Sequence, residues 1–193
     1  MDWFDQLLPF FQNGTYLAVF TVLVLCGMGL PVPEEATFIT AGYLVSLGNG
    51  TLGKMIATGV AGVLLGDICL FFLARNYGQT ILRLWPFRIM FSEKVLSKTK
   101  AFFEKHGDTA VFLAGFFAGI RASTFFLSGT MGYRFWKFFF WDFARTILTC
   151  PISIWAGYKF GPYADEWLGE NFLWILAVAF LVGAAAMIRK AYS

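Results

Sequence analysis

The 193-residue chain has few charged residues and a single histidine. Charged side chains make up 14% of the sequence, whereas a typical soluble domain has about 25%. The net charge of +3 is too small to indicate a polyanionic partner. This composition excludes a disordered chain and a nucleic-acid-binding protein, and it argues against a soluble globular enzyme.

Ligands for a metal or a redox cofactor are also scarce. His106 lies among charged residues, and Cys26, Cys69 and Cys150 lie in separate apolar runs. No spacing typical of a zinc or redox site occurs. We therefore expect no metal and no cofactor, and we expect the cysteines to be buried as small apolar residues.

Apolar residues are abundant, at 58% of the chain with 24 phenylalanines. A helix that spans a bilayer needs about 20 apolar residues, with about 17–25 tolerated. The runs 55–74, 138–160 and 172–188 meet this length. Proline or charge interrupts two further apolar regions, 15–48 and 109–133.

The charges between these runs predict the orientation of the chain. Segment 75–105 has only two acids, and the positive-inside rule therefore places it in the cytoplasm. Segment 161–171 carries three acids and no base, and is expected outside. The bases that favour the cytoplasmic side are Arg75, Arg83, Arg88, Lys94, Lys98, Lys100, Lys105, Arg134, Lys137, Arg189 and Lys190.

Both ends of 109–133 are therefore cytoplasmic, which predicts a re-entrant hairpin. Region 15–48 is expected to form a second hairpin from the opposite side, because prolines cannot continue a helix interior. Two short spans, 15–30 and 36–48, or a cytoplasmic segment 1–14, are alternatives. The expected hairpin breaks are Pro31, Pro33, Gly119 and Gly129.

The predicted fold is an all-α polytopic membrane protein with two opposed re-entrant hairpins and about three spanning helices, an inverted-repeat architecture. The whole of 1–193 forms one membrane domain. Its parts are a first hairpin plus span (15–74), a basic amphipathic cytoplasmic segment (75–108), a second hairpin plus span (109–160) and a closing span (172–188).

Several charges lie at membrane depth, where an ionised side chain costs about 2.5–3.5 kcal/mol on insertion scales. Such residues persist when they pair or line a wet cavity. Opposed hairpins would bring Glu34 and Glu35 towards Arg121, and Glu35 and Arg121 are favoured as the functional residues. Arg121 could bind a phosphate through its planar fork, and a buried carboxylate could carry a proton. Helix-locking salt bridges are the alternative. The candidate substrate-binding residues are Glu34, Glu35, Asp67, Arg121, Asp142 and Arg145.

The sequence resembles the DedA family, also called VTT or SNARE-associated membrane proteins. The resemblance rests on an ordered set of motifs that covers residues 25–161. These motifs are Gly29-Leu30-Pro31-Val32-Pro33-Glu34-Glu35, Ala41-Gly42, Gly66-Asp67, Phe102-Phe103-Glu104-Lys105-His106-Gly107, Phe116-Phe117-Ala118-Gly119-Ile120-Arg121, Ser128-Gly129-Thr130-Met131, Phe135-Trp136-Lys137-Phe138 and Gly157-Tyr158-Lys159-Phe160-Gly161.

The resemblance implies a flippase or scramblase in the plasma (inner) membrane. Its substrate would be a phosphate-headed lipid such as undecaprenyl phosphate or phosphatidylethanolamine, and its transport would be linked to protons in some members. An enzyme is not expected. A lipid-phosphate enzyme, a membrane scaffold and a small-ion or metalloid permease are the alternatives. The sequence leaves open the lipid, the direction, the coupling ion and whether the chain forms a homo-oligomer.

The chain departs from the family pattern at two charged positions. Many members carry an acid near the position of Cys26 and a second arginine at the position of Gly115. We expect Glu34 or Asp67 to replace the missing acid and Arg145 to replace the missing arginine.

Overall fold

The computed structural model describes residues 3–29, 34–81, 93–116 and 118–168. Within these ranges every element of secondary structure is helical, which confirms the predicted all-α class. The expected closing span 172–188 and the breaks at Pro31 and Pro33 lie outside the described residues. The elements are α1 (Trp3–Gly27), α2 (Glu34–Ser46), α3 (Leu52–Ile81), α5 (Glu93–His106), the 3-10 turn η1 (Gly107–Thr109), α6 (Ala110–Ala114), α7 (Ala118–Thr130) and α8 (Phe135–Leu168).

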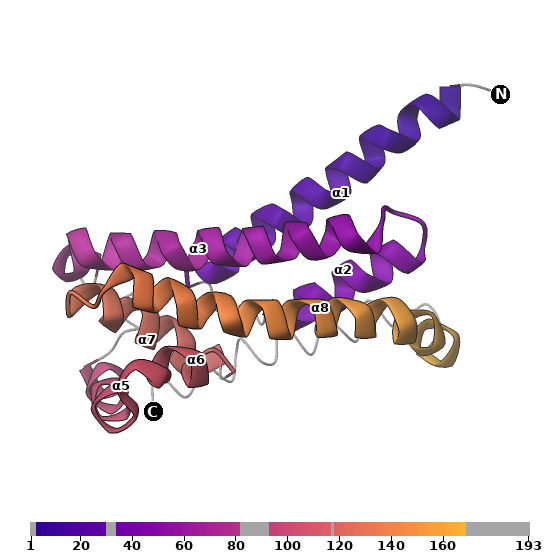
Figure 1. The fold of residues 1–193 in the computed structure, drawn as a ribbon. Coiled ribbons are helices and arrows are strands. Elements are labelled where there is room, and N and C mark those ends of the chain that lie inside the picture. The colour runs from indigo at the N-terminus through magenta and orange to yellow at the C-terminus, as the bar shows by residue number, and fades with distance from the viewer. Residues whose placement is uncertain (1–2, 30–33, 82–92, 117, 169–193) are drawn as a thin grey trace.

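Two long helices, α3 and α8, pack side by side and form the axis of the bundle (Figure 1). Helix α2 packs along α8, while α1 crosses α3 and then projects away from the bundle. Helix α7 packs against α3 towards the opposite end, and α5 covers α7. The two short helices α2 and α7 therefore lie against different parts of the same long pair.

Glycines allow the helices to cross closely. A methyl group added at Gly42 or Gly157 would lie 2.0 or 2.1 Å from a backbone oxygen of the facing helix, at the crossing of α2 with α8. Gly27 and Gly66 meet in the same way where α1 crosses α3. Such small-residue contacts are typical of helix packing in membranes, where close backbone approach replaces the hydrophobic driving force.

Two apolar clusters hold the bundle together. The first lies where α1, α2, α3 and α8 meet, and includes Leu23, Phe38 and Ile154. The second joins α3, α7 and α8 through rings such as Phe71 and Phe138, which stack with centroids 4.6 Å apart. Between the residues of the two clusters, α3 carries the buried Asp67, and α8 carries the buried Asp142 and Arg145.

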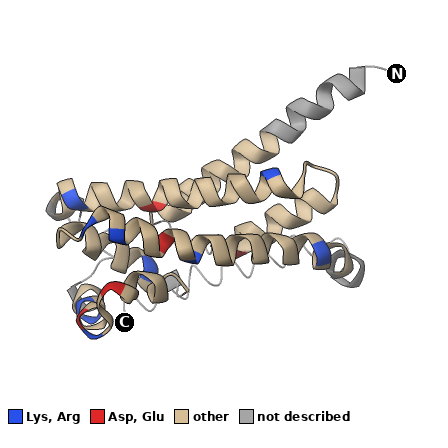
Figure 2. Cartoon of the chain, viewed as in Figure 1, with Lys and Arg blue, Asp and Glu red and all other residues tan. Residues whose placement is uncertain are grey.

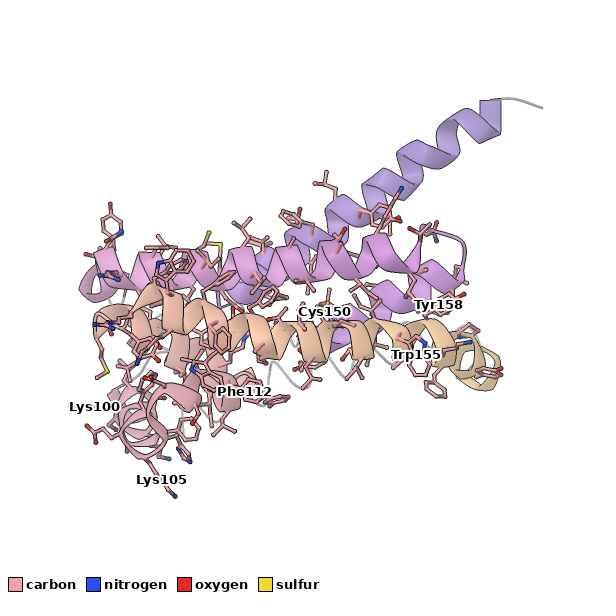
Figure 3. All side chains as sticks on the ribbon, in the orientation of Figure 1. Lys100, Lys105, Phe112, Cys150, Trp155 and Tyr158 are labelled. Carbon is pink, nitrogen blue, oxygen red and sulfur yellow. The ribbon has the colours of Figure 1, made fainter. Side chains whose placement is uncertain are left out.

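Helix α5 directs apolar residues at the protein rather than away from it. Leu96 and Phe103 pack against the second cluster, while Lys98 and Lys100 are exposed. Lys100 and Lys105 extend from α5 into the surroundings of the bundle (Figure 3). Helix α5 therefore covers the second cluster and leaves Lys98 and Lys100 exposed.

Of the described residues, one helical stretch, Leu52–Gly78, is long and apolar enough to cross a bilayer. The expected span 172–188 lies outside the described residues, so the count of about three spans stays a prediction. Gly119 and Gly129 lie inside α7 and are not breaks. Gly129 instead allows contact with α3, because a Cβ there would lie 2.4 Å from a backbone oxygen of that helix. The turn after α7 is at Gly132, whose φ of 68° suits glycine.

Candidate functional site

A buried charge cluster lies between the two apolar clusters, where α2, α3, α7 and α8 meet. None of its five charged residues is more than 6% exposed. Figure 2 shows acidic and basic positions midway along α3 and α8, separate from the basic residues at the end of the bundle. The members of this cluster are Glu34, Asp67, Arg121, Asp142 and Arg145.

Helix ends and helix middles both contribute to the cluster. Glu34 is the first residue of α2, and Arg121 lies in the first turn of α7. Asp67 lies near the middle of α3. Asp142 and Arg145 are three residues apart on α8, a spacing that places them on the same face. Helices α2 and α7 therefore begin beside charged residues of the longer helices α3 and α8.

The carboxylate of Glu34 bridges the two arginines. Its Oε2 accepts a hydrogen bond from Nη1 of Arg121, and its Oε1 accepts one from Nη1 of Arg145 at 2.6 Å. Hydrogen bonds between ionised partners are about twice as strong as neutral ones. Glu34 thus connects α2 to α7 and α8 at the same point.

Arg145 is the hub of the cluster. Besides Glu34, its Nη2 donates to Asp142 at 3.1 Å, to Asp67 at 3.3 Å and to Thr146 Oγ1 at 3.1 Å. Its aliphatic part runs across Gly115, where a Cβ would lie 1.8 Å from Cδ of the arginine. Arg145 was expected to replace an arginine absent at position 115, and its side chain does pack against that glycine.

Arg121 has a different set of partners. In addition to Glu34, its Nη2 donates to the backbone carbonyl of Cys26 at 3.3 Å and lies 3.7 Å from Asp67 Oδ1. The guanidinium also lies over the Phe125 ring, 5.9 Å from its centroid, a cation–π geometry. The backbone carbonyl of Cys26, near the end of α1, therefore belongs to the cluster. No feature of the sequence predicts this contact.

Of the two glutamates expected near Arg121, the structure pairs it with Glu34 and not with the favoured Glu35. Successive residues on a helix point about 100° apart, so only one of the two carboxylates can face the arginines. Glu34 is buried, whereas Glu35 is only partly buried. The two residues are adjacent in the sequence, and the rotation of α2 against α8 decides between them.

The formal charges of the cluster do not balance. Three carboxylates face two guanidinium groups, and a buried ion requires a partner. Asp67 Oδ1, Asp142 Oδ2, Thr124 Oγ1 and Arg145 Nε have no hydrogen-bond partner among the described residues. If every member is ionised, the cluster carries one uncompensated negative charge.

A second polar group lies at the start of α8, outside the buried charge cluster. Asp108 accepts hydrogen bonds from Lys137 and, at 2.9 Å, from the Tyr133 hydroxyl. These bonds, chiefly the one from Lys137, hold the pKa of Asp108 below its usual range. Burial and the bond to Asp108 raise the pKa of Tyr133. The group joins η1, after α5, to the turn before α8.

The described part of the chain contains no group of three or more His, Cys, Asp or Glu side chains arranged to hold a metal ion. Cys26 and Cys150 are buried and Cys69 is partly buried. The chemistry of the site therefore comes from carboxylates and guanidinium groups, which can bind anions, carry protons or lock helices together.

Comparison with known proteins relates this arrangement to a family. The model of the VTT domain matches residues 32–159, which include the whole buried charge cluster. An uncharacterized membrane protein of Haemophilus influenzae is 34% identical over 167 residues, covering 85% of this chain and 78% of the relative. Protein DedA of Escherichia coli is 28% identical over 181 residues, covering 89% and 82%.

A Bacillus subtilis membrane protein, YkoX, is 26% identical over 161 residues, covering 83% of this chain and 69% of the relative. No solved structure is significantly similar to the chain. The relatives from Haemophilus influenzae and Bacillus subtilis are named as membrane proteins, which agrees with the apolar helices described above. The chain therefore belongs to the VTT-domain, or DedA, family of membrane proteins.

Proposed function

We propose that this protein is a lipid transporter of the plasma (inner) membrane and not an enzyme. It moves a phosphate-headed lipid, such as undecaprenyl phosphate or phosphatidylethanolamine, between leaflets, and the movement is coupled to protons. The observation that carries the proposal is the carboxylate of Glu34, which bridges Arg121 and Arg145 in a buried site.

In this proposal Glu34 occupies the place of the substrate phosphate. Planar guanidinium forks match carboxylate and phosphate oxygens alike. A phosphate that reaches the cluster would take the same donors, Nη1 of Arg121 and of Arg145, and displace Glu34. The N-termini of α2 and α7 lie at the same place, and helix N-termini favour anions.

The proposed architecture follows from where the interrupted helices end. In this proposal α1 and α2 form one re-entrant hairpin and α6 and α7 form the other. The end of α1 and the starts of α2 and α7 contribute Cys26, Glu34 and Arg121 to the buried charge cluster. Broken helices that meet at the membrane midplane are typical of transporters, because exposed backbone is tolerated only against protein or water. The basic segment 75–105 would then lie in the cytoplasm.

A reconstituted assay tests the proposal. Vesicles that contain the purified protein and a headgroup-labelled phosphatidylethanolamine are treated with an impermeant quencher, with and without a pH gradient. We expect faster loss of the inner-leaflet label than in empty vesicles, a dependence on the gradient, and loss of the effect in Arg121→Ala. Lys100→Ala, on the exposed face of α5, is the control and should behave like wild type.

A labelled polyprenyl phosphate is tested in the same vesicles to compare the two lipid classes. Movement of either lipid by the wild type, abolished in Arg121→Ala, supports the proposal. Vesicles in which neither lipid moves faster than in protein-free controls would contradict it, as would full transport by Arg121→Ala.

A further inference from the structure

We infer that Asp67 and Asp142 share one proton in the buried charge cluster, and that this pair is the group through which protons act on transport. As a coupling group the pair rests on the proposed function. The presence of the shared proton does not depend on the proposed function, because it is argued from the contacts alone.

The first argument is the position of the two aspartates. An ionised carboxylate can only accept hydrogen bonds. Both aspartates accept from the same nitrogen, Nη2 of Arg145, at 3.3 Å for Asp67 and 3.1 Å for Asp142. The two hydrogens of this one nitrogen thus serve two carboxylates, which come from α3 and α8, and also the Thr146 hydroxyl. Both side chains are fully buried, so water at the protein surface cannot solvate the second charge.

The second argument concerns the oxygen atoms left over. Oδ1 of Asp67 and Oδ2 of Asp142 are buried acceptors with no hydrogen-bond donor among the described residues. A carboxylate has only acceptors, whereas a protonated carboxyl group gains one O–H donor. One proton on this pair therefore supplies the missing donor and removes the excess charge at the same time.

The other groups around the pair do not offer a better place for the proton. From α2, Glu34 uses both oxygens as acceptors for guanidinium groups. From α7 and α8, Arg121 and Arg145 stay charged, since a guanidinium cannot be deprotonated in proteins. From α1, Cys26 contributes a buried thiol, which is a weak donor and acceptor, and a carbonyl that accepts from Arg121.

The shared proton links the pair to the anion site. When it leaves, the two ionised aspartates compete with Glu34, or with a phosphate in its place, for Arg145. When it returns, Arg145 is free to hold the anion. Protonation on one side of the membrane would therefore strengthen substrate binding, and release on the other side would weaken it.

Infrared spectroscopy of the purified protein in an ester-free detergent tests whether the proton is present. At neutral pH we expect a carbonyl band of a protonated carboxylic acid that shifts to lower frequency in D2O. Asp67→Asn and Asp142→Asn should each lose the band, because two acids then balance two arginines. Asp108→Asn, outside the cluster, should retain it. Absence of the band in wild type, or its full strength in both cluster variants, would overturn the inference.

Thermal unfolding tests where the proton resides. Asparagine resembles a protonated aspartate, so Asp67→Asn should unfold at the wild-type midpoint, whereas Glu34→Gln should unfold several degrees lower. The reverse order would place the proton on Glu34 and overturn the inference. Both measurements are independent of lipid movement, so a protein that carries the proton but moves no lipid would refute the proposed function alone.

Discussion

The side chain of Arg145 crosses Gly115 so closely that no Cβ fits between them. An ideal Cβ at position 115 would lie 1.8 Å from Cδ and 2.5 Å from Nε of the arginine. Carbon atoms in contact are normally about 3.5–4.0 Å apart. Gly115 is thus a positioning residue for Arg145, the hub of the buried charge cluster.

The first prediction is that Gly115→Ala disrupts the cluster without changing any charge. The methyl group pushes Arg145 away from Glu34, Asp67 and Asp142, and breaking a buried ion pair costs about 3–5 kcal/mol. We expect a lower thermal midpoint in detergent and loss of lipid movement in vesicles.

Gly53→Ala is the matched control for this change. Gly53 lies in the first turn of α3, and an added Cβ meets nothing within 4 Å. Alanine is favoured over glycine in helices by about 1 kcal/mol, so this variant should be as stable as wild type or slightly more stable. Equal behaviour of the two alanine variants would refute the role given to Gly115.

The second prediction separates two neighbouring glutamates. Glu34→Gln removes the acceptor of two guanidinium groups and should lower the free energy of unfolding by about 3–5 kcal/mol. Glu35→Gln changes a partly buried residue beside the cluster and should stay within about 0.5 kcal/mol of wild type. Denaturation of both purified variants measures the difference, and a more damaging change at Glu35 would contradict the structure.

Local properties of the sequence predicted the helical class and the charged residues of the cluster. Hydropathy and charge are read within one segment, so an isolated Asp67 in an apolar run is visible without any structure. The other charged residues of the cluster could be predicted for the same reason, because each is a charged residue in an otherwise apolar segment. The choice between Glu34 and Glu35 was wrong because it depends on how α2 is rotated against α8, which neighbouring residues on one segment do not encode.

Glycine positions show a second limit of the sequence. A glycine can end a helix or allow close packing, and the two uses look the same in one dimension. Gly119 and Gly129 were expected as breaks, yet both lie inside α7, and Gly129 packs on α3. The contact of Gly115 with Arg145 joins residues 30 positions apart, so only the tertiary structure reveals it.

The third prediction concerns topology. Lys98→Cys on α5 and Lys54→Cys in the first turn of α3 are both exposed, and they lie towards opposite ends of the bundle. In intact cells, an impermeant thiol reagent should label position 54 and not position 98. After permeabilisation it should label both. The three native cysteines are buried or partly buried, so wild type treated with the same reagent gives the background labelling. Labelling of position 98 in intact cells would refute the cytoplasmic assignment.

The fourth prediction is a pH dependence at Asp108. Its pKa is lowered by the hydrogen bonds from Lys137 and Tyr133, so the folded state favours the ionised form. The resulting stability is present above the unfolded pKa of about 3.9 and is lost as the pH falls through the folded pKa. Asp108→Asn should therefore unfold at a lower temperature than wild type at pH 7, and the difference should shrink under acidic conditions. A difference that grows in acid would contradict this assignment.

The last prediction tests whether Arg121 acts as a planar fork. Arg121→Lys keeps the charge but offers a single ammonium group, which cannot serve Glu34, the Cys26 carbonyl and a phosphate in the geometry of a guanidinium. We expect lipid movement to fall nearly as far in Arg121→Lys as in Arg121→Ala.

The double variant Glu34→Gln with Arg121→Gln then separates stability from transport. It removes one acid and one base, which leaves Asp67, Asp142, Arg145 and the shared proton in balance. Its thermal midpoint should therefore be higher than that of either single glutamine variant, while lipid movement stays absent because one of the two anion-binding forks is gone. Recovery of transport together with stability would mean that Arg121 only holds the helices in place. Failure to recover stability would show that charge balance is not what keeps the cluster folded.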